Sequence, residues 1–186
     1  IPNDGTKKTH GPERDAFKST TLGVSFGMTE IGLSRKLSLD TGRVWTKEEA
    51  KSLIDMFYSV YTGVHEYQES VLNNYWKRGY LRLPCGWIMW GDNDNPRSVK
   101  NVPVQGTASS IMRKAVELAE ESGVSVIKTL HDAIYIEGEV GKESDILLLA
   151  DAMREASAWA YPDEEMKSYA RKIRLDATIW GPDYDY

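Results

Sequence analysis

The sequence predicts an α+β protein, in which a mostly helical first two-thirds precedes a small antiparallel sheet with flanking helices. Three observations predict this class. Apolar residues recur at helical spacing between residues 46 and 78. Two β-like runs, 124–130 and 133–137, are separated by only two residues, which is the spacing of a hairpin. A helical pattern over residues 142–161 follows the second run.

The first helix is expected over residues 12–26. Pro12 is tolerated in the first turn, where its missing N–H would have no partner, and Glu13 faces the positive end of the helix dipole. Gly27 ends this helix, and a second short helix is expected near residues 29–37.

A capping box opens a longer helical region. Glu49 follows Thr46 by three residues, so each side chain can bond the other residue's backbone N–H. The apolar stripe behind it continues to about Arg78, with an interruption expected at Gly63. We interpret the aromatic residues of this stripe as core packing.

The remaining elements are a hairpin, a long helix and a strand. Residues 79–90 combine glycine, proline and aromatic residues, which indicates an irregular hairpin. A long helix is expected over residues 97–121, because Gly123 follows it. Residues 172–179 are expected to form a final strand.

Composition indicates a folded protein whose charge is unevenly distributed. Of 186 residues, 41% are hydrophobic, yet no apolar run is long enough to span a membrane, so no membrane partner is expected. The single cysteine, Cys85, excludes an internal disulfide. Residues 1–114 carry sixteen basic and twelve acidic side chains, whereas residues 115–186 carry seven and sixteen. A basic part suits phosphate contacts, and an acidic part suits metal binding.

Asp132 is the strongest candidate for a metal ligand. With His131 it occupies the expected hairpin tip, where a rigid pair of strands would present its carboxylate to solvent. A turn-forming aspartate is the alternative interpretation. A lone carboxylate also binds Mg²⁺ poorly unless substrate phosphates or further carboxylates complete the site.

Two cations share one face of the first expected helix. Arg14 and Lys18 are four residues apart, and further steps of four reach Leu22 and Phe26. The dipole disfavours a cation near a helix N-terminus, so a bound polyphosphate would account for Arg14. Such positive charge could stabilise phosphoryl transfer. The alternative interpretation, to which we give equal weight, is a basic face that only contacts solvent.

A row of amide and guanidinium groups lies on the helix expected over residues 97–121. Arg97, Asn101 and Gln105 are spaced by four residues, and Gly106 permits close approach of another backbone. These groups could bond the acceptors that every base pair offers in the minor groove of DNA.

Together these motifs resemble the family A (DNA polymerase I-like) DNA polymerases. The resemblance covers roughly residues 12–180 and rests on four motifs in a fixed order. They are Arg14-x3-Lys18-x3-Leu22-Gly23-x2-Phe26-Gly27-Met28, then Gly79-Tyr80, then Pro103-Val104-Gln105-Gly106-Thr107-Ala108, then His131-Asp132. The resemblance implies a fingers-like helical part over residues 1–122 and the C-terminal part of a palm, with a palm-like sheet, over residues 123–186.

The resemblance also implies the roles of the candidate residues. On a nucleotide-binding helix of about residues 12–26, the incoming dNTP and the nascent base pair would be contacted by Arg14, Lys18, Leu22, Phe26 and Gly27. Primer–template DNA would be contacted by Arg97, Asn101 and Gln105. His131 would lie near the primer terminus, and Asp132 would be one of two aspartates that bind Mg²⁺. The catalytic residues would thus be Asp132, Lys18 and His131.

Three positions depart from the family pattern. Leu22 stands where Phe or Tyr is usual and is familiar mainly among viral members, which points to a phage or prophage source. Phe26 replaces a usual Tyr, and Ala133 replaces a usual Glu. In addition, the Asp-Tyr-Ser-like motif with the first metal-binding aspartate is not found in residues 1–13. Because a two-metal site needs carboxylates that bridge both ions, we expect the chain to need the N-terminal remainder of the polymerase as a partner.

The implied function is template-directed DNA synthesis, in the cytoplasm of a bacterium or an infected host cell. Two alternatives stay open: a single-subunit RNA polymerase fragment, and a non-catalytic nucleic-acid-binding or split-polymerase subunit. Gly79-Tyr80 and residues 103–108 favour the DNA enzymes, and Phe26 lacks the hydroxyl expected in an RNA polymerase. An incomplete sheet with an exposed edge would favour a split subunit.

Overall fold

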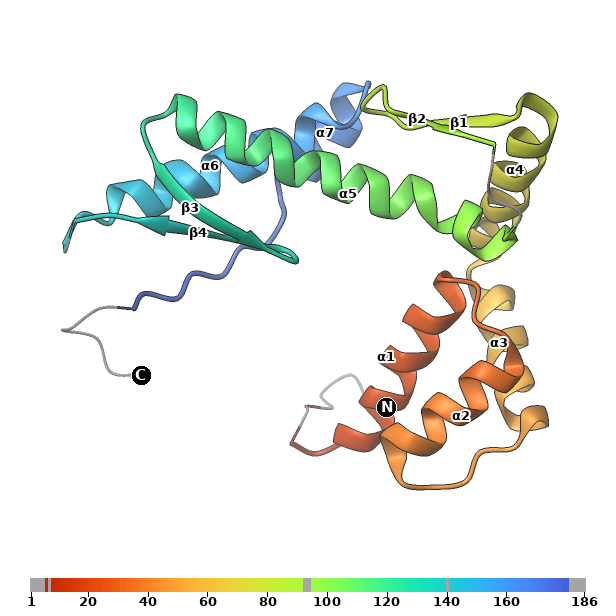
Figure 1. Ribbon diagram of the computed structural model, residues 1–186. Helices are drawn as coiled ribbons and strands as arrows, with labels where there is room; N and C mark the ends of the chain where they lie inside the picture. Colours follow the sequence, from red (N-terminus) through yellow and green to blue (C-terminus); the bar gives the residue numbers. More distant parts are fainter. Residues whose placement is uncertain (1–5, 7, 92–94, 140, 181–186) are drawn as a thin grey trace. The chain divides into compact units, whose positions relative to one another are not determined.

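The computed structural model describes residues 6, 8–91, 95–139 and 141–180. This part of the chain is mostly helical and contains two two-stranded sheets, which confirms the predicted α+β class. Figure 1 shows its elements. In chain order they are α1 (Gly11–Ser25), α2 (Glu30–Thr41), α3 (Lys47–Val60), α4 (Thr62–Arg78), β1 (Tyr80–Arg82), β2 (Ile88–Trp90), α5 (Pro96–Glu121), β3 (Ser125–Leu130), β4 (Ala133–Glu137), α6 (Ser144–Trp159) and α7 (Glu164–Ala170). None of the described helices is long and apolar enough to cross a lipid bilayer.

The chain divides into two compact units. Unit 1 comprises residues 1–81 and 89–101, and unit 2 comprises residues 82–88 and 102–186. The division falls inside α5, because the first turns of this helix are bonded to α1 and α4. The boundary predicted at residue 122 separates parts with different expected functions, not two compact units. The assignment of fingers and palm to its two sides stays a prediction.

The core of unit 1 lies where α1, α2 and α3 pack together. It is formed by Val24 of α1, Leu33 and Leu37 of α2, and Ala50 and Phe57 of α3. The buried positions within α2 and α3 are four and seven residues apart, so each helix turns one apolar stripe inward. The α1 face opposite Val24 is therefore left to solvent.

The helices of unit 1 differ from the sequence prediction in two places: α2 ends at Thr41 rather than near residue 37, and the break between α3 and α4 is displaced. The capping box is confirmed, since the Thr46 N–H bonds the Glu49 carboxylate at 2.8 Å and the Glu49 N–H bonds the Thr46 hydroxyl at 3.1 Å. The interruption predicted at Gly63 is wrong. The helix breaks at Tyr61 (φ −108°, ψ 60°), and Gly63 falls in the first turn of α4.

A close approach at Gly106 shapes unit 2. A Cβ on this glycine would overlap Leu83 Cδ1, and Leu83 is buried. The sequence predicted such an approach, although its partner is a side chain rather than the expected backbone. In the same loop the Cys85 thiol donates a hydrogen bond to the Ser110 hydroxyl at 3.1 Å. These contacts fix the loop between β1 and β2 against the middle of α5.

The predicted two-strand hairpin is confirmed in unit 2. β3 and β4 pair antiparallel with Leu130 opposite Ala133, so His131 and Asp132 form the two-residue turn. His131 has φ 54°, the only positive φ among the described non-glycine residues. Histidine adopts this region more often than most residues, but it remains uncommon, and the pairing of the strands on both sides holds it there.

The strand predicted over residues 172–179 is wrong. The structure has no regular element between residues 173 and 180. This segment contacts the hairpin through side chains instead, and the Trp180 ring stacks on Tyr135 with ring centroids 5.7 Å apart and an angle of 11° between the planes. Neither described strand of the hairpin pairs with this segment, so its backbone N–H and C=O groups take no part in a sheet.

Candidate functional site

The candidate nucleotide-binding face is the exposed side of α1. Arg14, Lys18 and Leu22 are all exposed, and Leu22 retains 47% of its accessible surface although it is apolar. Within the described residues no hydrogen bond or ion pair joins either cationic side chain to another group. The two cations are thus available to an external anion.

The inner side of α1 explains why this face points outward. Val24 and Thr20 are buried, and the Thr20 hydroxyl bonds the Ala16 carbonyl at 2.8 Å, so that its polar group is satisfied within the helix. Positions 16, 20 and 24 form one stripe on the face opposite the cations. Core packing of α1 therefore fixes the direction of Arg14 and Lys18.

A hydrogen bond between side chains also joins α1 to α2. The Ser19 hydroxyl donates to the Asp40 carboxylate at 2.5 Å, and Lys36 pairs with the same carboxylate at 3.0 Å. These two hydrogen bonds, that from Ser19 first, lower the pKa of Asp40 below its ordinary value. Asp40 thus stays ionised at neutral pH, and its partners are Ser19 and Lys36 rather than Arg14 or Lys18.

The end of α1 brings together four residues that the sequence predicted from two separate motifs. Arg97 Nε donates to the Gly27 carbonyl at 3.0 Å, and Asn101 Nδ2 donates to the Phe26 carbonyl at 3.2 Å. Gly27 has φ 71°, a left-handed conformation in which a residue with a side chain would be strained, and an added Cβ would contact the Arg97 side chain. The candidate nucleotide-binding and DNA-binding rows meet here.

A further ion pair holds the start of α5 in unit 1. Lys100 Nζ lies 2.7 Å from Glu69 Oε1 of α4. The hydrogen bond from Lys100 lowers the pKa of the Glu69 carboxyl below its ordinary value. The ionised pair orients the turn of α5 that carries Arg97 and Asn101.

The candidate metal ligand belongs to unit 2. Asp132 and His131 are both exposed at the hairpin turn, and Ala133, the residue after them, begins β4. Within the described residues, no group of three or more His, Cys, Asp or Glu side chains could hold a metal ion. Asp132 fits Mg²⁺ as a single carboxylate ligand at the end of a rigid support, and other ligands would have to complete the site.

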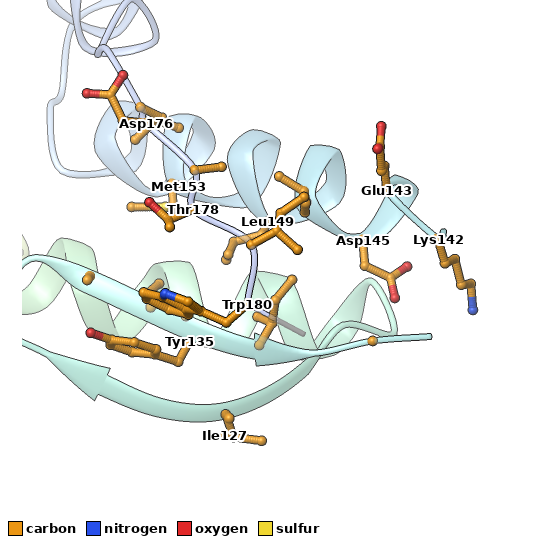
Figure 2. Close-up of a pocket in the computed structure, with 18 of the residues that line it drawn as sticks. Ile127, Tyr135, Lys142, Glu143, Asp145, Leu149, Met153, Asp176, Thr178 and Trp180 are labelled. Carbon is orange, nitrogen blue, oxygen red and sulfur yellow. The ribbon is translucent and has the colours of Figure 1, made fainter. Parts of the chain in front are cut away.

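A groove of about 720 Å³ adjoins the hairpin (Figure 2). It is bounded by β4, α6 and residues 174–180, and its lining includes Asp132 and the stacked rings of Tyr135 and Trp180. Gln105, the third member of the α5 row, is exposed and also belongs to unit 2. The structure therefore does not place Asp132 or Gln105 with the α1 residues.

Sequence reasoning missed Gln68 of α4. Its side chain is buried, with 4% of its surface accessible, and bonds the backbone at the end of α1. A signal was present, because Gln68 stands between Val64 and Val71 at helical spacing within an apolar stripe. A polar residue in such a stripe must find a buried partner.

Comparisons with known proteins agree with these motifs. Residues 3–162 match the family model for DNA polymerase family A. A thermostable DNA polymerase I from Thermus thermophilus is 30% identical over 163 residues, which cover 80% of this chain and 18% of that protein. DNA polymerase I from Pseudomonas aeruginosa is 26% identical over 143 residues, which cover 68% of this chain and 15% of that protein. The chain thus spans about a fifth or less of the length of these relatives.

A solved structure shares the fold. The POL domain of Pol1 from M. smegmatis, in a complex with DNA primer-template and dNTP, matches with a TM-score of 0.70 at 23% identity. The match covers 87% of this chain and 29% of that domain chain. The family model covers most of the chain, and the predicted resemblance is confirmed: this chain belongs to DNA polymerase family A.

Proposed function

We propose that this chain supplies the nucleotide-binding helix and one metal-binding aspartate of a DNA polymerase that extends a primer with dNTPs. The observation that carries the proposal is the exposed row of Arg14, Lys18 and Leu22 on α1, which leads to the end of the helix where Arg97 and Asn101 of α5 are bonded. The cationic face of α1 and the donors Arg97 and Asn101 thus belong to the same compact unit.

Arg14 and Lys18 would bind the triphosphate of the incoming dNTP. A guanidinium can bond two phosphate oxygens at once, and an ammonium adds a compact positive charge. Neither side chain has a competing partner in the described part of the chain. Their charge would stabilise the phosphoryl group most strongly as negative charge spreads over its oxygens during transfer.

Leu22 and Phe26 would contact the sugar and base of the same nucleotide. Leu22 is exposed one turn beyond Lys18, and Phe26 is half-buried one turn further on. Leu22 cannot stack as an aromatic ring does, so its contribution to base selection would come from shape alone. Phe26 keeps a ring but offers no hydroxyl.

Arg97, Asn101 and Gln105 would bond primer–template DNA. Arg97 uses Nε for the Gly27 carbonyl, and a guanidinium has four further N–H donors on its two amino groups. Donors of this kind suit the acceptors that correct base pairs present in the minor groove. The bonds of Arg97 and Asn101 to the end of α1 would couple DNA contact to nucleotide binding.

Asp132 would hold Mg²⁺ together with a second aspartate from outside residues 1–186, and His131 would lie beside the primer end. When bound, paired Mg²⁺ ions would activate the primer hydroxyl and stabilise the charge of the leaving pyrophosphate. The role of Asp132 is to offer a carboxylate at a fixed, exposed position that the β3–β4 pairing determines. One such carboxylate cannot bridge two ions alone, so the chain would act only when joined to the rest of the palm.

A primer-extension assay tests this proposal. The purified chain, incubated with a primed template, Mg²⁺ and all four dNTPs, is expected to add no nucleotides. The same chain joined to a family A N-terminal portion that carries the Asp-Tyr-Ser-like motif is expected to extend the primer. Extension by residues 1–186 alone, or failure of the joined, folded protein to extend with dNTPs, would refute the proposal.

A further inference from the structure

The last turn of α1 leaves three carbonyl groups without backbone partners. The Gly27 N–H bonds the Val24 carbonyl at 2.9 Å, and the Met28 N–H bonds the Gly23 carbonyl at 2.8 Å. With Gly27 in the left-handed region, this is a Schellman ending. Within the described residues no further backbone N–H bonds the carbonyls of residues 25, 26 and 27.

Side chains from α4 and α5 donate hydrogen bonds to all three of these carbonyls. The pairs are Gln68 with Ser25 at 2.9 Å, Asn101 with Phe26 at 3.2 Å, and Arg97 with Gly27 at 3.0 Å. The C-terminal end of a helix carries partial negative charge, so the guanidinium is also favoured by the dipole. We call these three donors the α1 clamp.

Gln68 differs from the other two donors because it is buried. Its Nε2 donates to Ser25, and its Oε1 accepts from the Tyr58 hydroxyl at 3.1 Å, so both ends of its amide are used. A side chain with 4% of its surface exposed has no access to DNA or nucleotide. Arg97 is exposed and Asn101 is half-buried, so those two could exchange a clamp bond for a bond to DNA.

We propose that Gln68 is a positioning residue that anchors the end of α1 and thereby sets where Leu22 and Phe26 meet the nucleotide. This inference rests on the proposed function for its effect on dNTP binding, but not for the anchoring itself. The α5 donors can be shared with DNA, whereas Gln68 keeps α1 attached to α4 in either state. Loss of Gln68 would loosen the last turn of α1 without removing any group that touches substrate.

Two variants separate the anchoring bond from ordinary core packing. Gln68→Met keeps the length of the side chain but removes both hydrogen bonds. Tyr58→Phe removes only the hydroxyl that Gln68 accepts and leaves the bond to Ser25 in place, so it is the matched control. If Gln68→Met does not fold, Gln68→Leu takes its place, because it too removes both hydrogen bonds and leaves a smaller apolar side chain in the buried site.

Amide hydrogen exchange of the whole chain tests the anchoring. In Gln68→Met, the amides of residues 26–28 are expected to exchange at least about tenfold faster, because local opening of the turn loses its buried bond. The same amides in Tyr58→Phe are expected to exchange within about threefold of the wild-type rate. The amides of α6 in unit 2 should be unchanged in both variants. Equal exchange in wild type and Gln68→Met would overturn the proposal.

Steady-state kinetics of the joined polymerase test the consequence for nucleotide. Gln68→Met is expected to raise KM for dNTP by about five- to tenfold and Tyr58→Phe by less than about twofold, with KM for primer–template unchanged in both. Equal effects of the two variants would show that packing, not the bond to Ser25, matters, and would overturn the positioning role. A wild-type joined protein that uses no dNTP would overturn the proposed function, while hydrogen exchange would still decide whether Gln68 anchors α1.

Discussion

Replacing Asp132 by alanine in the joined polymerase is expected to lower kcat by at least about a thousandfold, because a metal-bridging carboxylate cannot be replaced by the remaining ligands. Asp132 is exposed at a two-residue turn and has no hydrogen-bond partner among the described residues, so its removal should leave the fold intact. Single-turnover nucleotide incorporation measures the rate, and circular dichroism with thermal unfolding checks the fold.

Asp176→Ala is the matched control for this prediction. Asp176 is an exposed carboxylate that lines the same groove as Asp132, but it lies on the irregular C-terminal segment rather than on the hairpin turn. Its loss is expected to change kcat by less than about threefold. A near-normal kcat for Asp132→Ala, or equal losses in the two variants, would show that Asp132 does not bind the catalytic metal.

Replacing Lys18 by alanine should have the second-largest effect, a loss of about a hundredfold in kcat/KM for dNTP. Removing one charged donor from a developing phosphoryl charge typically has an effect of this size. The decrease in kcat/KM should exceed the decrease that a higher KM alone would cause, because the contact is strongest in the transition state. Incorporation rates over a range of dNTP concentrations separate the two terms.

Lys77→Ala provides the control for Lys18→Ala. Lys77 is an exposed lysine of the same unit, in the last turn of α4, and it has no ion-pair partner among the described residues. Its removal changes net charge by the same amount and should leave kcat/KM unchanged. If Lys18→Ala also leaves kcat/KM unchanged, α1 does not bind the triphosphate through this lysine.

Local chemistry explains which parts of the fold the sequence predicted. The capping box of Thr46 and Glu49, the Schellman glycine at position 27 and the two-residue turn at His131 and Asp132 each depend on neighbours in the chain. Steps of four on α1 likewise give the exposed row of cations without tertiary information. These elements were therefore predictable from sequence.

Features that depend on distant residues were not predictable in the same way. The break between α3 and α4 falls at Tyr61, a residue type that does not mark a helix end in a sequence, rather than at Gly63. The segment from 172 to 179 has a strand-like sequence, but a strand forms only by pairing with another backbone, and neither described strand of the β3–β4 hairpin pairs with it.

The same limit applies to the candidate site. Motif spacing identified Arg97 and Asn101 as polar residues on one helix, but it could not show that both bond the end of α1. Gln68 belongs to no motif, and its role follows from its hydrogen bond to the Ser25 carbonyl at the end of α1. Gln68 is thus a candidate positioning residue that the spacing of motifs does not reveal.

The most direct test of the account is to map where a dNTP contacts this chain. Amide and side-chain NMR signals would be followed at low salt, where charge interactions are least screened, during titration with a dNTP and separately with the deoxynucleoside that lacks phosphates. If α1 binds the triphosphate, the dNTP is expected to shift the signals of Arg14, Lys18 and Leu22, whereas the deoxynucleoside leaves those of Arg14 and Lys18 unchanged. Unchanged signals from these three residues at about 5 mM dNTP, in the presence of Mg²⁺, would contradict it.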